Sequence, residues 1–186
     1  MEVKGTSVRG TLEFVNKHFP ERKQEWLDSM PLSARELMSG LILTSNWYSI
    51  NDGLVLPIHA ISQLFYNGDD RNTAYVMGSY HAEQTLTGIY KFFVQLNTPW
   101  YIINKGVGVF SNYFRPCELD IARLGKTHIN IIIKSFPGIH EIIESSIEGW
   151  TKRAIEISGG TNVETSIPKS LTRNDSTSEI IFKWTA

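Results

Sequence analysis

Residues 117–136, CELDIARLGKTHINIIIKSF, contain two β-rich runs at 117–124 and 128–136. Between the runs lies the short polar turn Gly125-Lys126. Two such runs joined by a short glycine-containing turn are typical of a β-hairpin. We therefore expect an antiparallel pair of strands here.

A helix and a second pair of β-rich runs follow the hairpin. Pro137 and Gly138 end the second run, and helical spacing then continues up to Gly159-Gly160, where glycine is suited to ending a helix. Two further β-rich runs lie at 161–171 and 179–185. The order strand, strand, helix, strand, strand (ββαββ) predicts a four-stranded antiparallel sheet with one helix on its face.

The apolar positions of this segment have the spacing of the predicted elements. In the helix, an apolar residue recurs every three or four positions: Ile139, Ile143, Ile147, Trp150, Ala154 and Ile157. In two of the strands, alternate residues are apolar: Ile129, Ile131 and Ile133, then Ile180, Phe182 and Trp184. The helix should lie with its apolar stripe on the sheet. The last strand is also a candidate to pair across a two-fold axis in a homodimer.

Residues 1–115 show mainly helical patterns. Helices are expected over 10–28, with a break at Pro20, over 75–96 and over 100–114. Two further helices are expected to begin at a capping box formed by Ser33 and Glu36 and at a cap formed by Asn51 or Asp52. No linker or repeat divides the chain. We predict one α+β domain, 1–186, in which a helical part (1–115) precedes a ββαββ part (116–186).

Composition excludes several classes of protein. The net charge is −1 and the charges are dispersed, so the sequence lacks the basic stripe of a nucleic-acid-binding protein. The single cysteine, Cys117, excludes an intramolecular disulfide and a cysteine-rich zinc site. No stretch approaches the roughly 20 apolar residues of a membrane span, and the N-terminus does not resemble a signal peptide. We expect a cytoplasmic protein.

Several landmarks together resemble a known superfamily. They are, in order, Val3-Lys4-Gly5, Trp47-Tyr48, Gly78, Gly88-Ile89-Tyr90, Pro99, Tyr113 and Gly149-Trp150. The layout resembles the superfamily that includes the vinyl-4-reductase small-molecule-binding domain, the haem-based nitric-oxide-binding domain and the TRAPP vesicle-tethering subunits. Within it, nearly the whole chain is similar to an uncharacterised bacterial family abundant in myxobacteria. The resemblance implies a ligand site between the helices and the sheet.

The same resemblance bears on cofactors. Vinyl-4-reductase-type domains often carry Cys-x3-Gly-Asp-Pro-x-Cys on the last hairpin, but Ser170 and Ser178 stand at the two cysteine positions here. Serine is a poor zinc ligand, so zinc is disfavoured. The haem branch has a Tyr-x-Ser-x-Arg motif that binds the propionates, whereas Tyr48-Ser49-Ile50 is followed by no arginine. We therefore expect no cofactor, with haem also disfavoured.

Two single residues have side chains that could take part in cofactor binding or catalysis, His81 and Cys117. His81 is the type of residue that ligates haem iron, and the alternative is an ordinary hydrogen-bonded histidine. Cys117 has Glu118 and Asp120 nearby and no histidine in register, which would raise the thiol pKa. Because no catalytic constellation is present, we do not expect an enzyme.

Aromatic residues concentrate between positions 47 and 101. We predict that a ligand site is lined by Trp47, Tyr48, Tyr80, His81, Tyr90 and Trp100, and the alternative is that these residues fill the core. The leading hypothesis is a non-enzymatic sensory or regulatory domain that binds a small apolar or aromatic ligand. The rival is a dimeric, TRAPP-like interaction module without a ligand. Expected partners are a small hydrophobic ligand, a second copy of the chain and an unknown protein.

Overall fold

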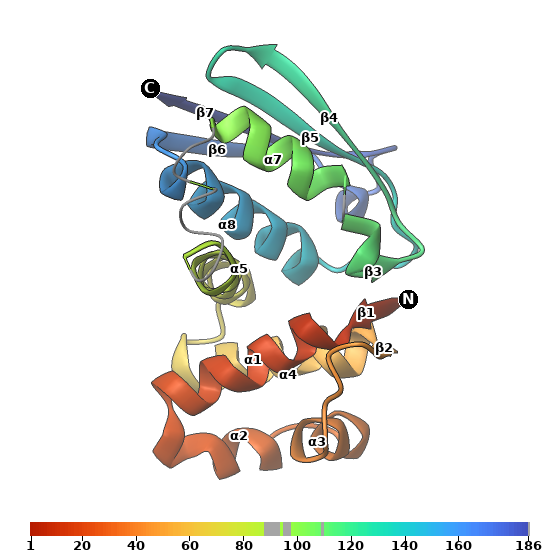
Figure 1. The fold of residues 1–186 in the computed structure, drawn as a ribbon. Coiled ribbons are helices and arrows are strands. Elements are labelled where there is room, and N and C mark those ends of the chain that lie inside the picture. Colours follow the sequence, from red (N-terminus) through yellow and green to blue (C-terminus); the bar gives the residue numbers. More distant parts are fainter. Residues whose placement is uncertain (88–93, 95–97, 109, 186) are drawn as a thin grey trace.

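A computed structural model describes residues 1–87, 94, 98–108 and 110–185. The α+β class is confirmed, with helices packed on antiparallel sheets (Figure 1). The larger sheet has four strands: β4 (Glu118–Gly125), β5 (His128–Ser135), β6 (Thr161–Lys169) and β7 (Ser178–Thr185). Its order is β4-β5-β7-β6, and each neighbouring pair is antiparallel.

Helix α8 (Glu141–Ile157) connects the two hairpins and packs on one face of this sheet (Figure 1). It begins later than the sequence suggested, because the ring of His140 caps it by accepting a hydrogen bond from the N–H of Ile142 at 3.2 Å. Gly159 follows the helix with a φ of 101°, a conformation that favours glycine. The predicted end of the helix is therefore confirmed.

The last strand does not lie at an edge of the sheet. β7 pairs with β5 on one side and with β6 on the other, and its residues Ile180, Phe182 and Trp184 are buried. The prediction that this strand pairs across a two-fold axis is therefore wrong, since both of its sides are already used. The edges of the sheet are β4 and β6.

The N-terminal helices lie on the side of α8 that faces away from the larger sheet (Figure 1). They are α1 (Gly5–His18), η1 (Pro20–Arg22), α2 (Lys23–Asp28), α3 (Leu32–Ser39), η2 (Asn51–Val55), α4 (Leu56–Phe65) and α5 (Asp70–Leu86). The break at Pro20 is confirmed. The part of the predicted 75–96 helix beyond Leu86 lies largely outside the described residues.

The predicted caps of two helices differ from those observed. Ser33 donates its hydroxyl proton to Asp52 at 2.8 Å instead of capping its own helix. Asp52 lies inside η2, which continues directly into α4. A contact between residues distant in sequence has therefore taken the place of two local caps, which a local pattern cannot reveal.

A small three-stranded sheet lies next to the N-terminus of the chain. Its strands are β1 (Glu2–Lys4), β2 (Trp47–Ser49) and β3 (Phe114–Arg115), in the order β2-β1-β3. The prediction that residues 1–115 are only helices and loops is thus corrected. Strands of two or three residues are too short to show an alternating pattern.

Helices α5 and α8 cross very closely. A Cβ atom at Gly149 would lie 2.0 Å from the carbonyl oxygen of Tyr75, and one at Gly78 would lie 2.1 Å from that of Ser146. Across the crossing, the hydroxyl of Ser79 donates to the carbonyl oxygen of Gly149 at 3.1 Å. The absence of a side chain at two glycines therefore allows the helical part to pack directly against the ββαββ part.

Candidate functional site

His81 projects from α5 toward α1 and is the most unusual of the predicted site residues. The residue is only partly exposed, and its Nε2 atom is buried without a hydrogen-bond partner among the described residues. A Cβ atom at Gly10 of α1 would lie 2.7 Å from this Nε2. Because most buried polar atoms are hydrogen-bonded, the unpaired Nε2 calls for an explanation.

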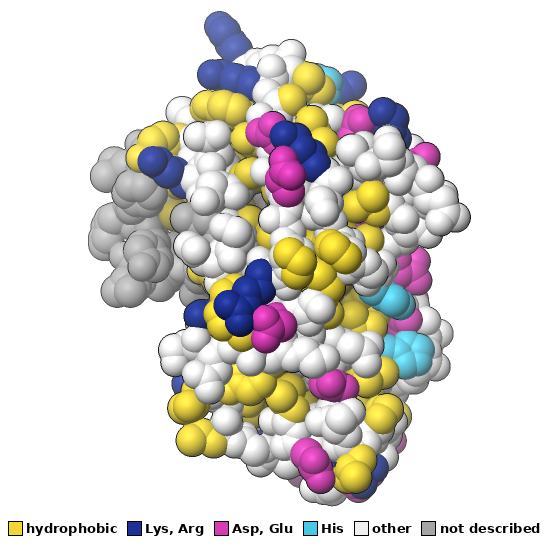
Figure 2. Space-filling view, turned by 90° about the vertical axis from the view of Figure 1, so that its right-hand side faces the viewer, with side chains coloured by type: hydrophobic (Ala, Val, Ile, Leu, Met, Phe, Trp, Pro, Cys, Tyr) yellow, Lys and Arg dark blue, Asp and Glu magenta, His cyan; other side chains and the backbone are white. Residues whose placement is uncertain are grey.

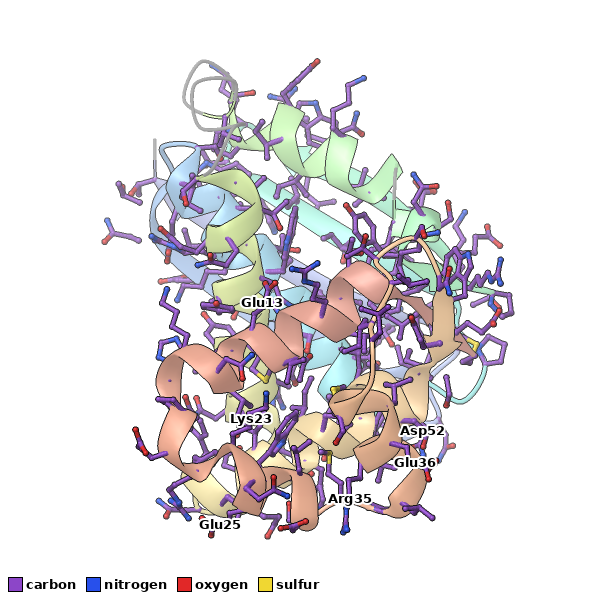
Figure 3. All side chains as sticks on the ribbon, turned by 60° about the horizontal axis from the view of Figure 1, so that its bottom comes forward. Glu13, Lys23, Glu25, Arg35, Glu36 and Asp52 are labelled. Carbon is purple, nitrogen blue, oxygen red and sulfur yellow. The ribbon has the colours of Figure 1, made fainter. Side chains whose placement is uncertain are left out.

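The surroundings of His81 keep its ring neutral. Its pKa lies below the ordinary value of 6.5, chiefly because burial disfavours the charged imidazolium. The backbone of Gly10, which lies close to the ring but not in the geometry of a hydrogen bond to Nε2, and the negative charge of Glu13 act in the opposite direction. Glu13 extends from α1 beside α5 (Figure 3). A neutral imidazole can offer a lone pair or an N–H to a bound group.

Tyr80 lies beside His81 and joins an aromatic cluster between α5 and α1. Its ring centroid is 6.0 Å from that of His81, 5.1 Å from that of Phe14 and 5.5 Å from that of His18. The pKa of Tyr80 is raised, first by burial and second by the charge of Glu13. The predicted pair Tyr80 and His81 is therefore found within one interface of apolar and aromatic side chains.

The other predicted residues lie on different elements. Trp47 and Tyr48 are on β2, and Trp100 is on α7 (Pro99–Gly108), at separate places in Figure 1. The guanidinium of Arg115 lies 4.0 Å from the ring centroid of Trp47, and the Tyr48 hydroxyl accepts a hydrogen bond from the N–H of Leu43 at 2.8 Å. The ring of Trp100 faces Arg123 at 5.2 Å. Tyr90 lies outside the described residues.

A groove of about 620 Å³ lies between α7 and β4. Its apolar walls include Val107, Phe110, Leu119 and Ile121, and its polar walls include Lys105. None of the predicted site residues that the structure describes lines this groove. No sequence pattern indicates this groove, because it forms only when α7 packs beside a strand that follows it in the chain.

Cys117 lies at one end of the groove. Burial raises the pKa of its thiol, and the thiol donates a hydrogen bond to the carbonyl oxygen of Phe114 at 3.1 Å. The thiol is therefore protonated at neutral pH, in which form it is a poor nucleophile.

The two serines at the last hairpin surround a buried carboxylate. Ser170 donates to Glu144 of α8 at 2.6 Å, and Ser178 donates to the other oxygen of the same carboxylate. The hydroxyl oxygen of Thr172 lies 3.5 Å from the Oε2 atom of Glu144. Within the described ranges, no group of three or more His, Cys, Asp or Glu side chains is placed to hold a metal ion.

Charged side chains of both signs are spread over the surface (Figure 2). On the face shown in Figure 2, acidic and basic side chains are dispersed among apolar and uncharged ones. None of the helices that the structure describes is long and apolar enough to cross a membrane.

Comparisons with known proteins identify the fold. No protein-family description and no curated protein matches the sequence. An Fe(II) unliganded H-NOX protein from K. algicida matches with a TM-score of 0.70 and 12% identity, over 98% of this chain and 97% of that one. An H-NOX protein from S. oneidensis in the Fe(II)NO ligation state matches with a TM-score of 0.72 and 13% identity, over 98% and 99%.

A third match is the IWP-051-bound H-NOX from Shewanella woodyi in the Fe(II)CO ligation state, with a TM-score of 0.68 and 15% identity over 97% of this chain and 94% of that one. Nearly the whole chain therefore has the same α+β fold as these H-NOX proteins. The myxobacterial and TRAPP-like details of the resemblance stay predictions.

The comparisons correct one expectation. No cofactor was expected and haem was disfavoured, but the structures that share this fold are H-NOX proteins described in Fe(II), Fe(II)NO and Fe(II)CO states, which overturns that expectation. Of the described residues, His81 has the donor chemistry of an axial ligand, with a neutral ring and an unpaired Nε2. In the arrangement described, however, α1 at Gly10 lies directly against that atom. The described residues therefore leave no room for a haem iron beside the Nε2 atom of His81.

Proposed function

We propose that this protein is a non-enzymatic sensory domain that binds a small, largely apolar ligand at the interface between α1 and α5. The observation that carries the proposal is the buried and unpaired Nε2 of His81, in a chain that shares the H-NOX fold over nearly its whole length. H-NOX domains are sensors rather than enzymes, which supports the non-enzymatic class.

The chemistry around His81 defines the kind of ligand. The Phe14 and Tyr80 rings present apolar surface, and His81 contributes a neutral polar group. A suitable ligand therefore has an apolar or aromatic frame and one group that bonds to the imidazole. This combination of apolar walls with a few polar contacts is typical of small-molecule sites.

Binding at His81 requires α1 to move, because Gly10 now lies against the Nε2 atom. A ligand stabilises the opened arrangement only as far as its affinity for that arrangement exceeds its affinity for the closed one. Since α5 also packs on α8, a change between α1 and α5 is transmitted to the helix that lies on the sheet. This is the proposed sensory response.

Haem is the first probe, because the fold points to it. Haem is titrated into the purified protein and into the variants His81→Gln and His59→Gln, and the Soret absorbance is recorded. His59 is the control because it pairs with Asp70 on the surface, at 2.8 Å. A Soret band that requires His81 but not His59 would identify haem as the ligand.

If no such band appears, a panel of hydrophobic small molecules is tested by thermal shift on the same three proteins. A shift that His81→Gln abolishes supports the proposal with a ligand other than haem. If no compound shifts the melting temperature of the wild type, or if His81→Gln shifts equally, the proposal is refuted.

The remaining functional expectations stay predictions. That Trp47, Tyr48, Tyr90 and Trp100 also line a ligand site stays a prediction, which their alanine variants test in the thermal-shift assay. The rival function, a dimeric TRAPP-like module, predicts a ligand-free dimer in sedimentation experiments. The cytoplasmic location awaits a fractionation experiment.

A further inference from the structure

The loop that joins α3 to β2, residues 40–46, presents apolar side chains to solvent (Figure 1). Residues 37–51, which include this loop, contain no charged side chain. Leu41 is 84% exposed and Leu43 is 47% exposed, whereas Ile42 between them is only 7% exposed. Two large apolar side chains exposed together on one uncharged loop are typical of a surface that binds a partner.

The loop is held in place by contacts with its neighbours. The N–H of Leu43 donates to the hydroxyl of Tyr48 at 2.8 Å, and the N–H of Gly5 donates to the carbonyl oxygen of Asn46 at 2.9 Å. The side chain of Ile42 belongs to the core. The two leucines that flank Ile42 are therefore presented in fixed positions, so that binding through them requires little ordering of the chain.

Aromatic and cationic side chains lie at the base of the loop. The ring of Trp47, the residue after the loop, has the Lys4 ammonium 4.7 Å and the Arg115 guanidinium 4.0 Å from its centroid. Tyr113 is also exposed, and its carbonyl oxygen accepts a hydrogen bond from the N–H of Lys4 at 2.8 Å. Tryptophan, tyrosine and long cationic side chains suit the boundary between lipid chains and lipid headgroups, because each has an apolar body and a polar end.

The charges beside the loop favour an anionic partner. The Glu2 carboxylate is paired with Arg115 at 2.7 Å. Within the described ranges, Lys4 has no acidic partner, so the group formed by Glu2, Lys4 and Arg115 has one net positive charge. A bilayer with anionic headgroups complements this charge. It also accepts protruding leucines without a matching pocket, whereas a protein partner needs a complementary surface.

The geometry points to a surface that docks on an anionic lipid bilayer. Leu41 and Leu43 enter the boundary of the acyl chains, Trp47 and Tyr113 lie at the level of the headgroups, and Lys4 meets their negative charge. The protein contacts the membrane in this way without spanning it. The inference does not depend on a ligand at the interface between α1 and α5, and the two proposals can fail separately.

The test is co-sedimentation of the full chain with lipid vesicles. One set of vesicles is phosphatidylcholine alone, and the other contains equal parts of phosphatidylcholine and phosphatidylserine. The proteins are the wild type, Leu41→Asn, Lys4→Gln and the control Leu124→Asn. Leu124 is a matched control because it is also an exposed leucine, at 52%, but lies on β4 in the larger sheet.

We expect the wild type to bind the phosphatidylserine vesicles more tightly than the neutral ones. Leu41→Asn should weaken this binding at least about tenfold, since the transfer of one leucine side chain out of water is lost. Lys4→Gln should weaken binding to the anionic vesicles about fivefold and leave binding to the neutral ones unchanged, because it removes one charge. Leu124→Asn should bind like the wild type.

Three results would overturn the proposal. The first is a wild type that does not sediment with phosphatidylserine vesicles at about 1 mM lipid, or that binds neutral vesicles as tightly. The second is equal binding by Leu41→Asn and the wild type, or an equal loss in Leu124→Asn. The third comes from analytical ultracentrifugation without lipid: a dimer that Leu41→Asn dissociates would assign the loop to contact with a second copy of the chain.

Discussion

The substitution Gly149→Ala probes the crossing that joins the two parts of the molecule. The added Cβ would lie 2.0 Å from the carbonyl oxygen of Tyr75. The obstructing atom belongs to the backbone of α5, so no rotation of a side chain can relieve the clash. Helices α5 and α8 would have to move apart.

The size of the effect follows from the contact distances. Ordinary contacts of a Cβ atom begin at 3.4 Å, so the helices would separate by about 1.4 Å near Gly149. Overpacking of this kind costs about 1–3 kcal/mol, and loss of the hydrogen bond between Ser79 and Gly149 adds about 1 kcal/mol. The higher helix propensity of alanine offsets about 1 kcal/mol of this loss of stability. The net expected loss is about 1–3 kcal/mol, or about 3–9 °C in Tm for a chain of this size.

Urea denaturation followed by circular dichroism measures this loss, and calorimetry measures the change in Tm. Gly108→Ala is the control, because a Cβ at Gly108, the last residue of α7, would meet nothing within 4 Å. It should leave stability unchanged or raise it slightly. If Gly149→Ala is as stable as the wild type, the close crossing and the proposed transmission through it are refuted.

Further predictions concern single residues. The pKa of His81 in the folded protein lies below its ordinary value of 6.5, so the unfolded chain binds more protons and stability should fall as the pH drops below about 6.5. The difference in the free energy of unfolding between pH 7 and pH 5 should therefore be smaller in His81→Gln than in the wild type. An equal difference in the two proteins would contradict this. Glu144→Ala leaves two buried serine hydroxyls without their acceptor and should lower the free energy of unfolding by about 2–4 kcal/mol. The control Glu141→Ala, on the exposed side of α8, should lower it by less than about 1 kcal/mol. Asp69 caps α5 by accepting from the N–H of Asn72 at 2.9 Å, so Asp69→Ala should cost about 1 kcal/mol in the same assay; an unchanged midpoint would count against the cap.

Elements with strong periodicity could be predicted from the sequence. The apolar stripe of α8 and the alternation in β5 and β7 located these elements to within a few residues, because burial on one face imposes the pattern directly. The position of β7 inside the sheet could not be predicted, since alternation shows which side chains are buried but not which strands are neighbours. The small sheet was missed because its strands are too short to alternate.

The helix that carries two of the expected site residues could be predicted. Tyr80 and His81 were correctly placed on one helix, and the structure adds that α1 covers the Nε2 of His81. No sequence pattern reports an unpaired buried atom, because that depends on the backbone of a distant helix. The groove beside β4 was missed for the same reason. The absent Tyr-x-Ser-x-Arg motif argued against haem, yet the fold is shared with H-NOX proteins described in Fe(II) states at 12–15% identity, which shows that a fold can persist when local motifs differ.

Native mass spectrometry of the protein purified from its own host tests the central claim most directly. The account predicts a small molecule retained by the wild type under gentle conditions and lost from His81→Gln, with its mass showing whether it is haem. A wild type that carries no ligand, or a ligand retained equally by His81→Gln, would contradict the account.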